Sequence, residues 1–250
     1  MSYVVACENL WKSYQSYRRV GLKSLLVGTE APRDTRFSRQ WALNDVSFRV
    51  AKGQAFGVVG HNGSGKSTLL SILLGTVSAD RGRLEVGGRV ASLLELGAGF
   101  HPDLTGRENV FLFGSILGMT LREIRERIDA IVEFSELESA VETPLRTYSA
   151  GMIARLGFSI IIQSPADVLL IDEVLAVGDA RFQDKCRDRL HEFKKRNGTL
   201  IIVSHNLKEL AEVCDEGVCL DLGHVVDAGP IDRVIAGYAS RMAVPPPAKP

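Results

Sequence analysis

The 250-residue sequence has little of several features that would narrow its function at once. Its four cysteines form no CxxC pair, which argues against a disulfide framework and indicates reduced thiols. Lysine plus arginine equals aspartate plus glutamate at 30 each, so no overall charge favours binding to nucleic acid. No apolar run approaches the roughly 20 residues of a membrane span, and the N-terminus has no signal-peptide pattern. We therefore expect a protein of the cytosol that acts on a membrane only through a partner.

A glycine-rich segment, Gly60–Thr68, lies between the apolar run Ala55–Val59 and a segment with helical spacing, Leu69–Leu74. Glycines let backbone N–H groups converge on an anion, and the following helix presents its positive N-terminal end. Lys66 can reach the β- and γ-phosphates of a nucleotide, and Ser67 can offer its hydroxyl to Mg²⁺. Strand, loop and helix in this order predict a nucleoside triphosphate site rather than a chance turn. The loop residues expected at the nucleotide are His61, Asn62, Gly63, Ser64, Gly65, Lys66, Ser67 and Thr68.

An acidic pair follows a second apolar run. Val168–Ile171 predicts a buried strand of a parallel sheet, and Asp172 and Glu173 stand at its carboxyl end, where α/β sheets bind ligands. Asp172 is expected to hold Mg²⁺ opposite Ser67, and Glu173 to orient the attacking water and accept its proton. Alone, such a pair could equally open a surface turn. Beside a phosphate-binding loop, it predicts a catalytic site.

A third motif indicates the family. Tyr148–Met152 precedes a helix and lies about twenty residues before Glu173. In register with the other two motifs, it resembles the signature sequence of the ATP-binding-cassette (ABC) ATPases, and the resemblance covers about residues 3–235. The resemblance implies an α/β fold, with a P-loop NTPase core of the ABC type, an inserted helical subdomain and an antiparallel β subdomain. It also implies that the protein hydrolyses ATP with Mg²⁺.

Further site residues follow from this resemblance. Ser149 and Gly151 match the signature residues that bind the γ-phosphate of an ATP held by a second copy of the chain. Asp179 matches the aspartate of the dimer interface, and His205 matches the histidine that contacts the γ-phosphate. Asp179 and His205 could instead be ordinary residues of a turn and of a strand end.

Two positions depart from the family pattern or leave a choice open. Glu95 stands where the family has its glutamine loop and is included with Ser67 and Asp172 among the metal contacts, although an ionised glutamate only accepts hydrogen bonds. For adenine, the resemblance points to Tyr14, which follows the first strand. Trp41 and Tyr17 compete for that role, because a long insert loosens the alignment.

The sequence around these motifs resembles one subfamily, the ATPase subunits of bacterial exporters of O-antigen, capsule and teichoic acid. The resemblance rests on the stretch from Ser92 through Asn109, together with the Tyr148–Met152 and Glu173–Asp179 segments. It implies ATP-powered export of a lipid-linked polysaccharide. The implied partners are a second copy of this chain, two copies of a polytopic membrane permease and the polysaccharide, with no nucleic acid. The implied location is peripheral, at the cytoplasmic face of the inner membrane.

A basic insert, residues 15–40, has two interpretations. In the subfamily a helix in this region lies near the membrane, where the lipid-linked glycan enters, and basic side chains would suit anionic headgroups. A solvated surface loop remains the alternative.

We assign residues 1–96 and 165–235 to the catalytic ATP-binding core, 97–164 to the helical subdomain with the signature motif, and 236–250 to a proline-rich tail. The helical subdomain is expected to contact the permease, and the Thr120–Glu123 capping box predicts the start of one of its helices. Two alternatives remain open. One is the ATPase of another ABC transporter, for import or small-molecule efflux, and the other is a soluble regulatory ABC ATPase.

Overall fold

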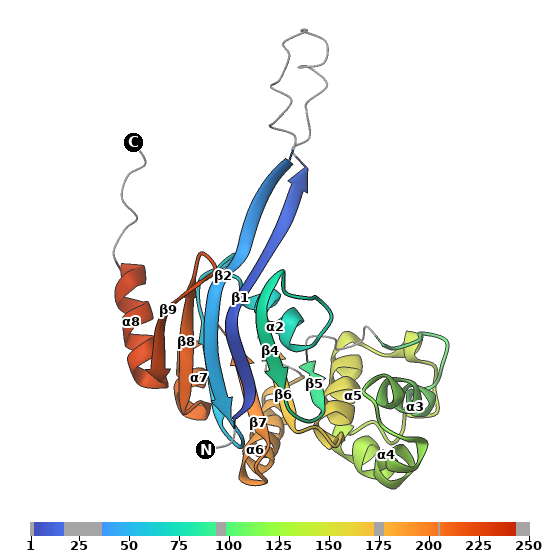
Figure 1. The fold of residues 1–250 in the computed structure, drawn as a ribbon. Coiled ribbons are helices and arrows are strands. Elements are labelled where there is room, and N and C mark those ends of the chain that lie inside the picture. Colours follow the sequence, from blue (N-terminus) through green and yellow to red (C-terminus); the bar gives the residue numbers. More distant parts are fainter. Residues whose placement is uncertain (1–2, 18–36, 94–98, 173–177, 205, 244–250) are drawn as a thin grey trace, which may run out of the picture.

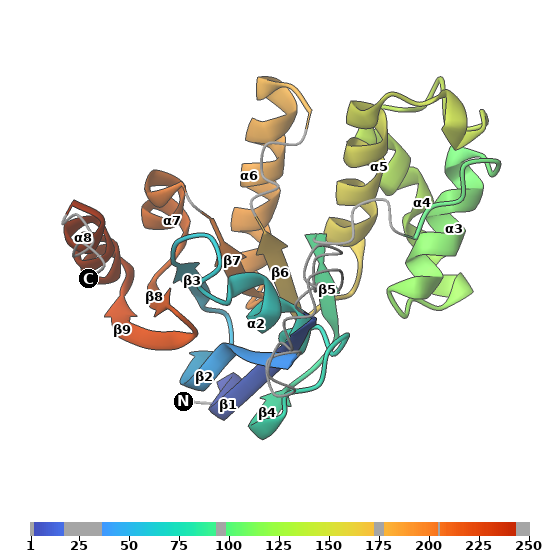
Figure 2. The same ribbon diagram turned by 90° about the horizontal axis from the view of Figure 1, so that it is seen from above.

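The computed structural model describes residues 3–17, 37–93, 99–172, 178–204 and 206–243. In this part of the chain, two sheets form an α/β core, and a group of helices lies to one side of it (Figures 1 and 2). The predicted α/β class, with its inserted helices and separate antiparallel sheet, is confirmed.

The larger described sheet has six strands. In spatial order they are β5 (Val90–Ser92), β6 (Val168–Asp172), β7 (Thr199–Val203), β3 (Ala55–Val59), β8 (Glu216–Asp221) and β9 (His224–Pro230). Pairing is parallel from β5 through β8, and only β9 is antiparallel. The three central strands β6, β7 and β3 are apolar and buried on both faces, as a covered parallel sheet requires. Their carboxyl ends bring the Gly60–Thr68 loop and Asp172 to one edge of the sheet.

A second sheet packs against the first across the helix that follows the phosphate-binding loop. It consists of β2 (Phe37–Ala51), β1 (Tyr3–Tyr17) and β4 (Arg81–Val86), all antiparallel. Helix α2 (Lys66–Leu73) lies between the two sheets (Figure 2), and its buried Leu69 and Leu70 belong to the same apolar cluster as Val46 and Val58. The phosphate-binding loop is therefore fixed by core packing on both sides of α2.

The first two strands are longer than their apolar patterns indicate. Pairing of β1 with β4 ends at Trp11, but pairing of β1 with β2 continues outward to Tyr17. Residues 12–17 and 37–43 thus form a two-stranded extension beyond the sheet, called here the β1–β2 ribbon (Figure 1). The ribbon takes in both ends of the segment that the sequence marks as an insert, and residues 18–36 lie outside the described residues.

Helices cover the other face of the large sheet and form the inserted group. The inserted helices are α3 (Gly106–Ile116), α4 (Leu121–Ser135) and α5 (Ala150–Gln163). A short 3-10 helix, Leu145–Thr147, precedes α5. The covering helices are α6 (Ala180–Lys195), α7 (Leu207–Val213) and α8 (Ile231–Ala243). Among the described helices, none combines the length and the apolar character needed to cross a bilayer.

The end of the core differs from the sequence assignment. The sequence assignment starts the proline-rich tail at residue 236, but α8 continues to Ala243, so that boundary falls inside a helix. The helix continues because Val234 is fully buried and Ile235 and Tyr238 pack against the core. A helical apolar face thus extends past the point at which we ended the core.

All four cysteines are buried free thiols: Cys7, Cys186, Cys214 and Cys219. Burial raises the pKa of the Cys7, Cys186 and Cys214 thiols to about 12. Such thiols are poor nucleophiles and act as small apolar core residues.

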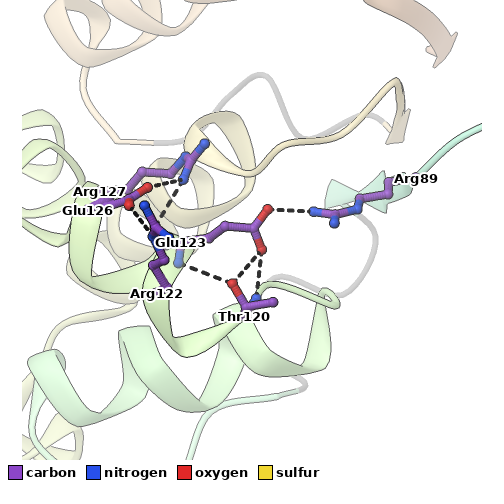
Figure 3. Close-up of polar contacts among 6 residues, drawn as sticks. All are labelled: Arg89, Thr120, Arg122, Glu123, Glu126 and Arg127. Carbon is purple, nitrogen blue, oxygen red and sulfur yellow. Dashed lines mark hydrogen bonds and ion pairs between the residues drawn. The ribbon is translucent and has the colours of Figure 1, made fainter.

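A polar contact joins the inserted helices to the core at the start of α4 (Figure 3). Thr120 caps α4 and forms the predicted capping box with Glu123, whose carboxylate accepts hydrogen bonds from the Thr120 N–H at 2.7 Å and hydroxyl at 2.9 Å. The second carboxylate oxygen of Glu123 pairs with Arg89 at 2.9 Å. Arg89 directly precedes β5, and its backbone N–H donates to Asp167, which precedes β6. Glu123 therefore connects α4 to the edge of the core.

Glu123→Gln is expected to lower the free energy of unfolding at neutral pH. The Thr120 amide and the Arg89 guanidinium hold the pKa of Glu123 at about 2, below its usual 4.5. Because the folded-state pKa is depressed, the stabilisation is present above pH 4.5 and is lost as pH falls toward 2. Urea unfolding followed by circular dichroism at several pH values measures this, and Thr120→Ala gives a reference loss of about 1 kcal/mol for the cap alone.

Glu126→Gln is the matched control for this prediction. Glu126 pairs with Arg122 and Arg127 of the same helix and has no ion pair outside it among the described residues. A loss for Glu123→Gln no larger than that for Glu126→Gln, or one that persists unchanged at pH 2, would refute the connecting role of Glu123.

Candidate nucleotide site

A cavity of about 420 Å³ opens between the phosphate-binding loop and the β1–β2 ribbon. Its walls come from the ribbon, the loop, the start of α2 and the end of β6. The lining residues are Tyr14, Gln40, Trp41, Ala42, Asn62, Gly63, Gly65, Lys66, Ser67, Thr68 and Asp172. The structure thus brings most of the predicted loop residues together with Asp172 and Tyr14, which come from three separate regions of the sequence.

The loop adopts a backbone that glycine alone accommodates well. Gly63 has φ of 83° and Gly65 has φ of 110°, a region that side chains disfavour. A Cβ on Gly65 would also lie 2.4 Å from the carbonyl oxygen of Ala42. The glycines at these two positions therefore allow the loop to curl tightly against β2 and into the first turn of α2.

Lys66 lies at the centre of this curl. It is only 9% exposed, and its Nζ donates hydrogen bonds to the carbonyls of Gly60 at 2.6 Å and His61 at 2.9 Å. The ammonium group is therefore held inside the loop, beside the amino-terminal end of α2. A positive charge and a helix N-terminus together favour a bound phosphate.

Ser67 and Asp172 offer two of the oxygen ligands that a magnesium ion could use. Both line the cavity, Ser67 from the first turn of α2 and Asp172 from the end of β6. One hydroxyl and one carboxylate are oxygen ligands of the kind Mg²⁺ takes alongside water and substrate phosphates. These residues fit Mg²⁺, which would neutralise charge on the phosphates.

Two loop residues predicted to bind nucleotide point elsewhere. His61 Nε2 is hydrogen-bonded to the carboxylate of Asp221, which ends β8, at 2.8 Å. His61 Nδ1 is hydrogen-bonded to the carbonyl of Asn62 at 2.7 Å. Ser64 is fully buried under the loop. Its carbonyl accepts from the Gly223 N–H at 3.0 Å, in the turn between β8 and β9. Among the described atoms, His61 and Ser64 thus connect the loop to the end of β8 and the turn that follows it, and they do not line the cavity.

The signature residues lie on the inserted helices and do not line this cavity. Ser149 is the N-cap of α5 and its Oγ accepts from the Met152 N–H at 3.2 Å. Gly151 is exposed, and a Cβ there would meet only Ser149 Oγ, at 3.9 Å. Asp179 is the N-cap of α6 and accepts from the Phe182 N–H at 2.9 Å. Among the described residues, only the Ser149 hydroxyl thus lies close to the Cβ position of Gly151 at the start of α5.

Three predicted site residues, Glu95, Glu173 and His205, lie outside the described residues. The structure places only their neighbours. Asp172 ends β6 just before Glu173, and Ser204 follows β7 just before His205. Their roles remain predictions from the sequence.

The register of the β1–β2 ribbon places Tyr14 and Trp41 on successive pairs that present opposite faces, although both residues line the cavity. Ser13 pairs with Trp41, and Tyr14 pairs with Gln40. The side chain of the third candidate, Tyr17, lies outside the described part of the chain. Trp41 is engaged by the Arg39 guanidinium at 4.7 Å and by the edge of Trp11 at 5.2 Å. Tyr14 is 45% exposed at the cavity. Sequence reasoning missed Gln40, because its place at the cavity depends on its pairing with Tyr14 across the ribbon.

A phosphate-binding loop, an acidic strand end beside it and helices inserted between β5 and β6 together define an ATP-binding-cassette domain. A family model for ABC transporters matches residues 43–176, more than half of the chain. The chain belongs to the ABC transporter family and is one of its ATP-hydrolysing subunits.

Several curated proteins are similar over most of this chain. An O-antigen export system ATP-binding protein, RfbB of Klebsiella pneumoniae, is 43% identical over 97% of this chain and 100% of its own length. A teichoic acids export ATP-binding protein, TagH of Staphylococcus haemolyticus, is 37% identical over 95% of this chain and 89% of its own. TagH of Lactococcus lactis is 40% identical over 85% of this chain but only 45% of its own.

Solved structures share the fold at lower identity. An ATP-binding subunit of an ABC transporter matches with a TM-score of 0.75 at 21% identity, covering 95% of this chain and 94% of that one. A dimeric ATP-binding cassette in a post-hydrolysis state, bound to ADP and Pi, matches with a TM-score of 0.72 at 19% identity, covering 91% and 98%. At this identity the likeness establishes the fold alone.

Proposed function

We propose that this chain is the ATPase subunit that powers export of a lipid-linked polysaccharide, of O-antigen or capsule type, across the inner membrane. The observation that carries the proposal is the similarity, over nearly the whole chain, to ATP-binding proteins of O-antigen and teichoic acid export. The ABC fold by itself serves many transport directions and cargoes, so it does not select among them.

Within the proposed site, the triphosphate of ATP lies against the loop and Lys66, where backbone amides and the ammonium balance its charge. Ser67 and Asp172 hold Mg²⁺. Glu173, which directly follows Asp172, orients the attacking water and accepts its proton, and His205 contacts the γ-phosphate. Tyr14 lies against the adenine ring, a role supported by its exposure at the cavity.

We propose that two copies of the chain form the complete site. Ser149 and Gly151 bind the γ-phosphate of ATP held by the partner copy, and Asp179 lies at the interface between the copies. This is supported by the open space around Gly151 and by the separation of α5 from the cavity-lining residues. Because one copy leaves the γ-phosphate open on one side, ATP should drive association and hydrolysis should release it.

The membrane partner would be a polytopic permease, present in two copies, and the ATPase would lie at the cytoplasmic face of the inner membrane. The inserted helices are the proposed contact. At the turn between α3 and α4, Ile116 is 56% exposed and Leu121 is 54% exposed, which offers apolar surface to a partner.

Reconstitution with its membrane permease tests the cargo. In liposomes, lipid-linked polysaccharide is expected to change the ATPase rate of the complex, whereas the free oligosaccharide should leave it unchanged. A complex carrying Lys66→Ala should hydrolyse no ATP under either condition. A response to a small molecule in place of the lipid-linked glycan would favour the importer or efflux alternative. Recovery of the chain with ribosomes or DNA, without a membrane protein, would contradict a transport role.

A further inference from the structure

The β1–β2 ribbon is anchored at its base by one carboxylate, that of Asp80. Oδ2 accepts hydrogen bonds from the Ser13 N–H at 3.0 Å and hydroxyl at 2.6 Å and pairs with Arg39 at 3.3 Å. Oδ1 pairs with Lys12 at 3.1 Å. Donation from Ser13, with further bonds from Lys12 and Arg39, holds the pKa of Asp80 well below its usual range. The carboxylate therefore stays ionised at neutral pH and ties both strands of the ribbon to one point.

The same network continues into the aromatic residues of the ribbon. Arg39 Nε donates to the Ser13 hydroxyl at 2.7 Å, and its guanidinium lies 4.7 Å from the centre of the Trp41 ring. Trp41 packs edge-to-face on Trp11 at 5.2 Å, and the Asp80 N–H donates to the Trp11 carbonyl at 2.7 Å. Asp80 thus contacts the backbone of β1 at Trp11 and Ser13 and, through Arg39, is connected to the Trp41 ring.

The ribbon needs such an anchor. Beyond the pair Trp11–Arg81, β1 no longer pairs with β4, and β2 is its only partner strand in the described part of the chain. A two-stranded ribbon without a third strand or a packed face is marginally stable in water. Asp80 directly precedes Arg81, the first residue of β4, so its hydrogen bonds replace the lost pairing at this point of β1.

The anchor also connects two walls of the cavity. Asp80 belongs to the segment that follows α2, whose first turn carries Lys66 and Ser67. Opposite it, the ribbon presents Tyr14 and Gln40, which are direct cross-strand partners and therefore share one face. The position of these two side chains relative to the phosphate-binding loop depends on where the ribbon is held.

We propose that Asp80 is a positioning residue for nucleotide recognition, which holds Tyr14 and Gln40 at the distance from the phosphate-binding loop that suits the base of ATP. This inference rests on the proposed placement of adenine against the ribbon. A purely structural role for Asp80 would affect all ligands of the loop alike. A positioning role affects only ligands that carry a base.

Equilibrium binding to the full chain separates these roles. Asp80→Asn and Asp80→Ala should weaken Mg²⁺–ATP binding by about 5- to 150-fold, the range that stacking of a base on an aromatic ring contributes. Binding of Mg²⁺–tripolyphosphate, which has the phosphates but no base, should stay within about twofold. In the ATPase assay, KM for ATP should rise while kcat stays near the wild-type value.

Tyr14→Ala and Glu8→Gln complete the design. Tyr14→Ala should give the same base-dependent loss, and combining it with Asp80→Asn should add little, because both changes remove one interaction. Glu8→Gln removes a 2.9 Å ion pair with Arg49 from the same two strands, away from the cavity, and should change neither affinity.

Circular dichroism and the melting temperature establish that each variant is folded, and Asp80→Asn carries the test if the alanine variant is not. Equal losses for ATP and tripolyphosphate, no loss with a folded Asp80 variant, or additive losses with Tyr14→Ala would overturn the positioning role. Failure of the wild-type chain to bind ATP would overturn the proposed site itself.

Discussion

Replacing Glu173 with glutamine is expected to lower the steady-state ATPase rate by about 10²- to 10⁴-fold, the usual contribution of a general base. Glutamine keeps the size and polarity of the side chain but cannot accept the proton of the attacking water. ATP binding should persist, because the loop and Lys66, which line the cavity and are proposed to bind the phosphates, are unchanged. Phosphate release gives the rate, and titration with labelled ATP gives the affinity.

Glu209→Gln is a matched control for this substitution. Glu209 lies in the first turn of α7 and, like Glu173, follows a parallel strand of the central sheet. It does not line the cavity, so its variant should hydrolyse ATP at close to the wild-type rate. Wild-type turnover in Glu173→Gln would show that another group accepts the proton.

Lys66→Ala is expected to abolish measurable turnover and to weaken ATP binding by about 10- to 100-fold, since hydrogen bonds to charged groups contribute about 1.5–3 kcal/mol. Two effects combine. The ammonium that would face the phosphates is lost, and the loop loses the hydrogen bonds from Nζ to the carbonyls of Gly60 and His61. Because these contacts belong to the phosphate end of the cavity, the affinity for tripolyphosphate should fall by the same factor as that for ATP.

Lys52→Ala controls for the general loss of a lysine. Lys52 is exposed in the turn that leads into β3, at the opposite end of that strand from the loop, and should leave both affinities unchanged. If Lys66→Ala retained wild-type affinity for ATP, the cavity beside the loop would not be the triphosphate site.

The sequence predicts well those parts of the site that are local in the chain. The glycine-rich loop after β3 and the carboxylate at the end of β6 each lie within about ten residues of the apolar run that identifies them. Apolar runs and glycine turns have a direct local physical meaning, so their order along the chain is enough to place Lys66, Ser67 and Asp172 together.

Local sequence patterns do not predict contacts between segments that are distant in the chain. His61 pairs with Asp221, 160 residues further along, and Asp80 pairs with Lys12, 68 residues back. Either aspartate looks like an ordinary loop residue in sequence, because its role depends on which strands the fold brings together. The ribbon was missed for the same reason, since Tyr14 and Gln40 have no apolar alternation that marks their pairing.

The signature and dimer-interface residues illustrate a different limit. Ser149 and Asp179 both act as helix N-caps within one chain, a role that either residue type fills in many proteins. A contact with a second copy would use the same helix ends from outside. The cap roles are complete within one chain and therefore do not reveal a contact between copies. The proposed shared site needs a measurement that detects association of two copies.

The mass of the Glu173→Gln chain in solution tests the ATP-bridged dimer most directly. By light scattering after size exclusion, we expect twice the 27.3 kDa of one chain in Mg²⁺ and ATP, and 27.3 kDa in ADP. Adding Ser149→Arg, which places a bulky charged side chain at the start of α5, should keep the mass at one chain even with ATP. A mass of one chain for Glu173→Gln at saturating ATP would contradict the proposal that two copies enclose the nucleotide.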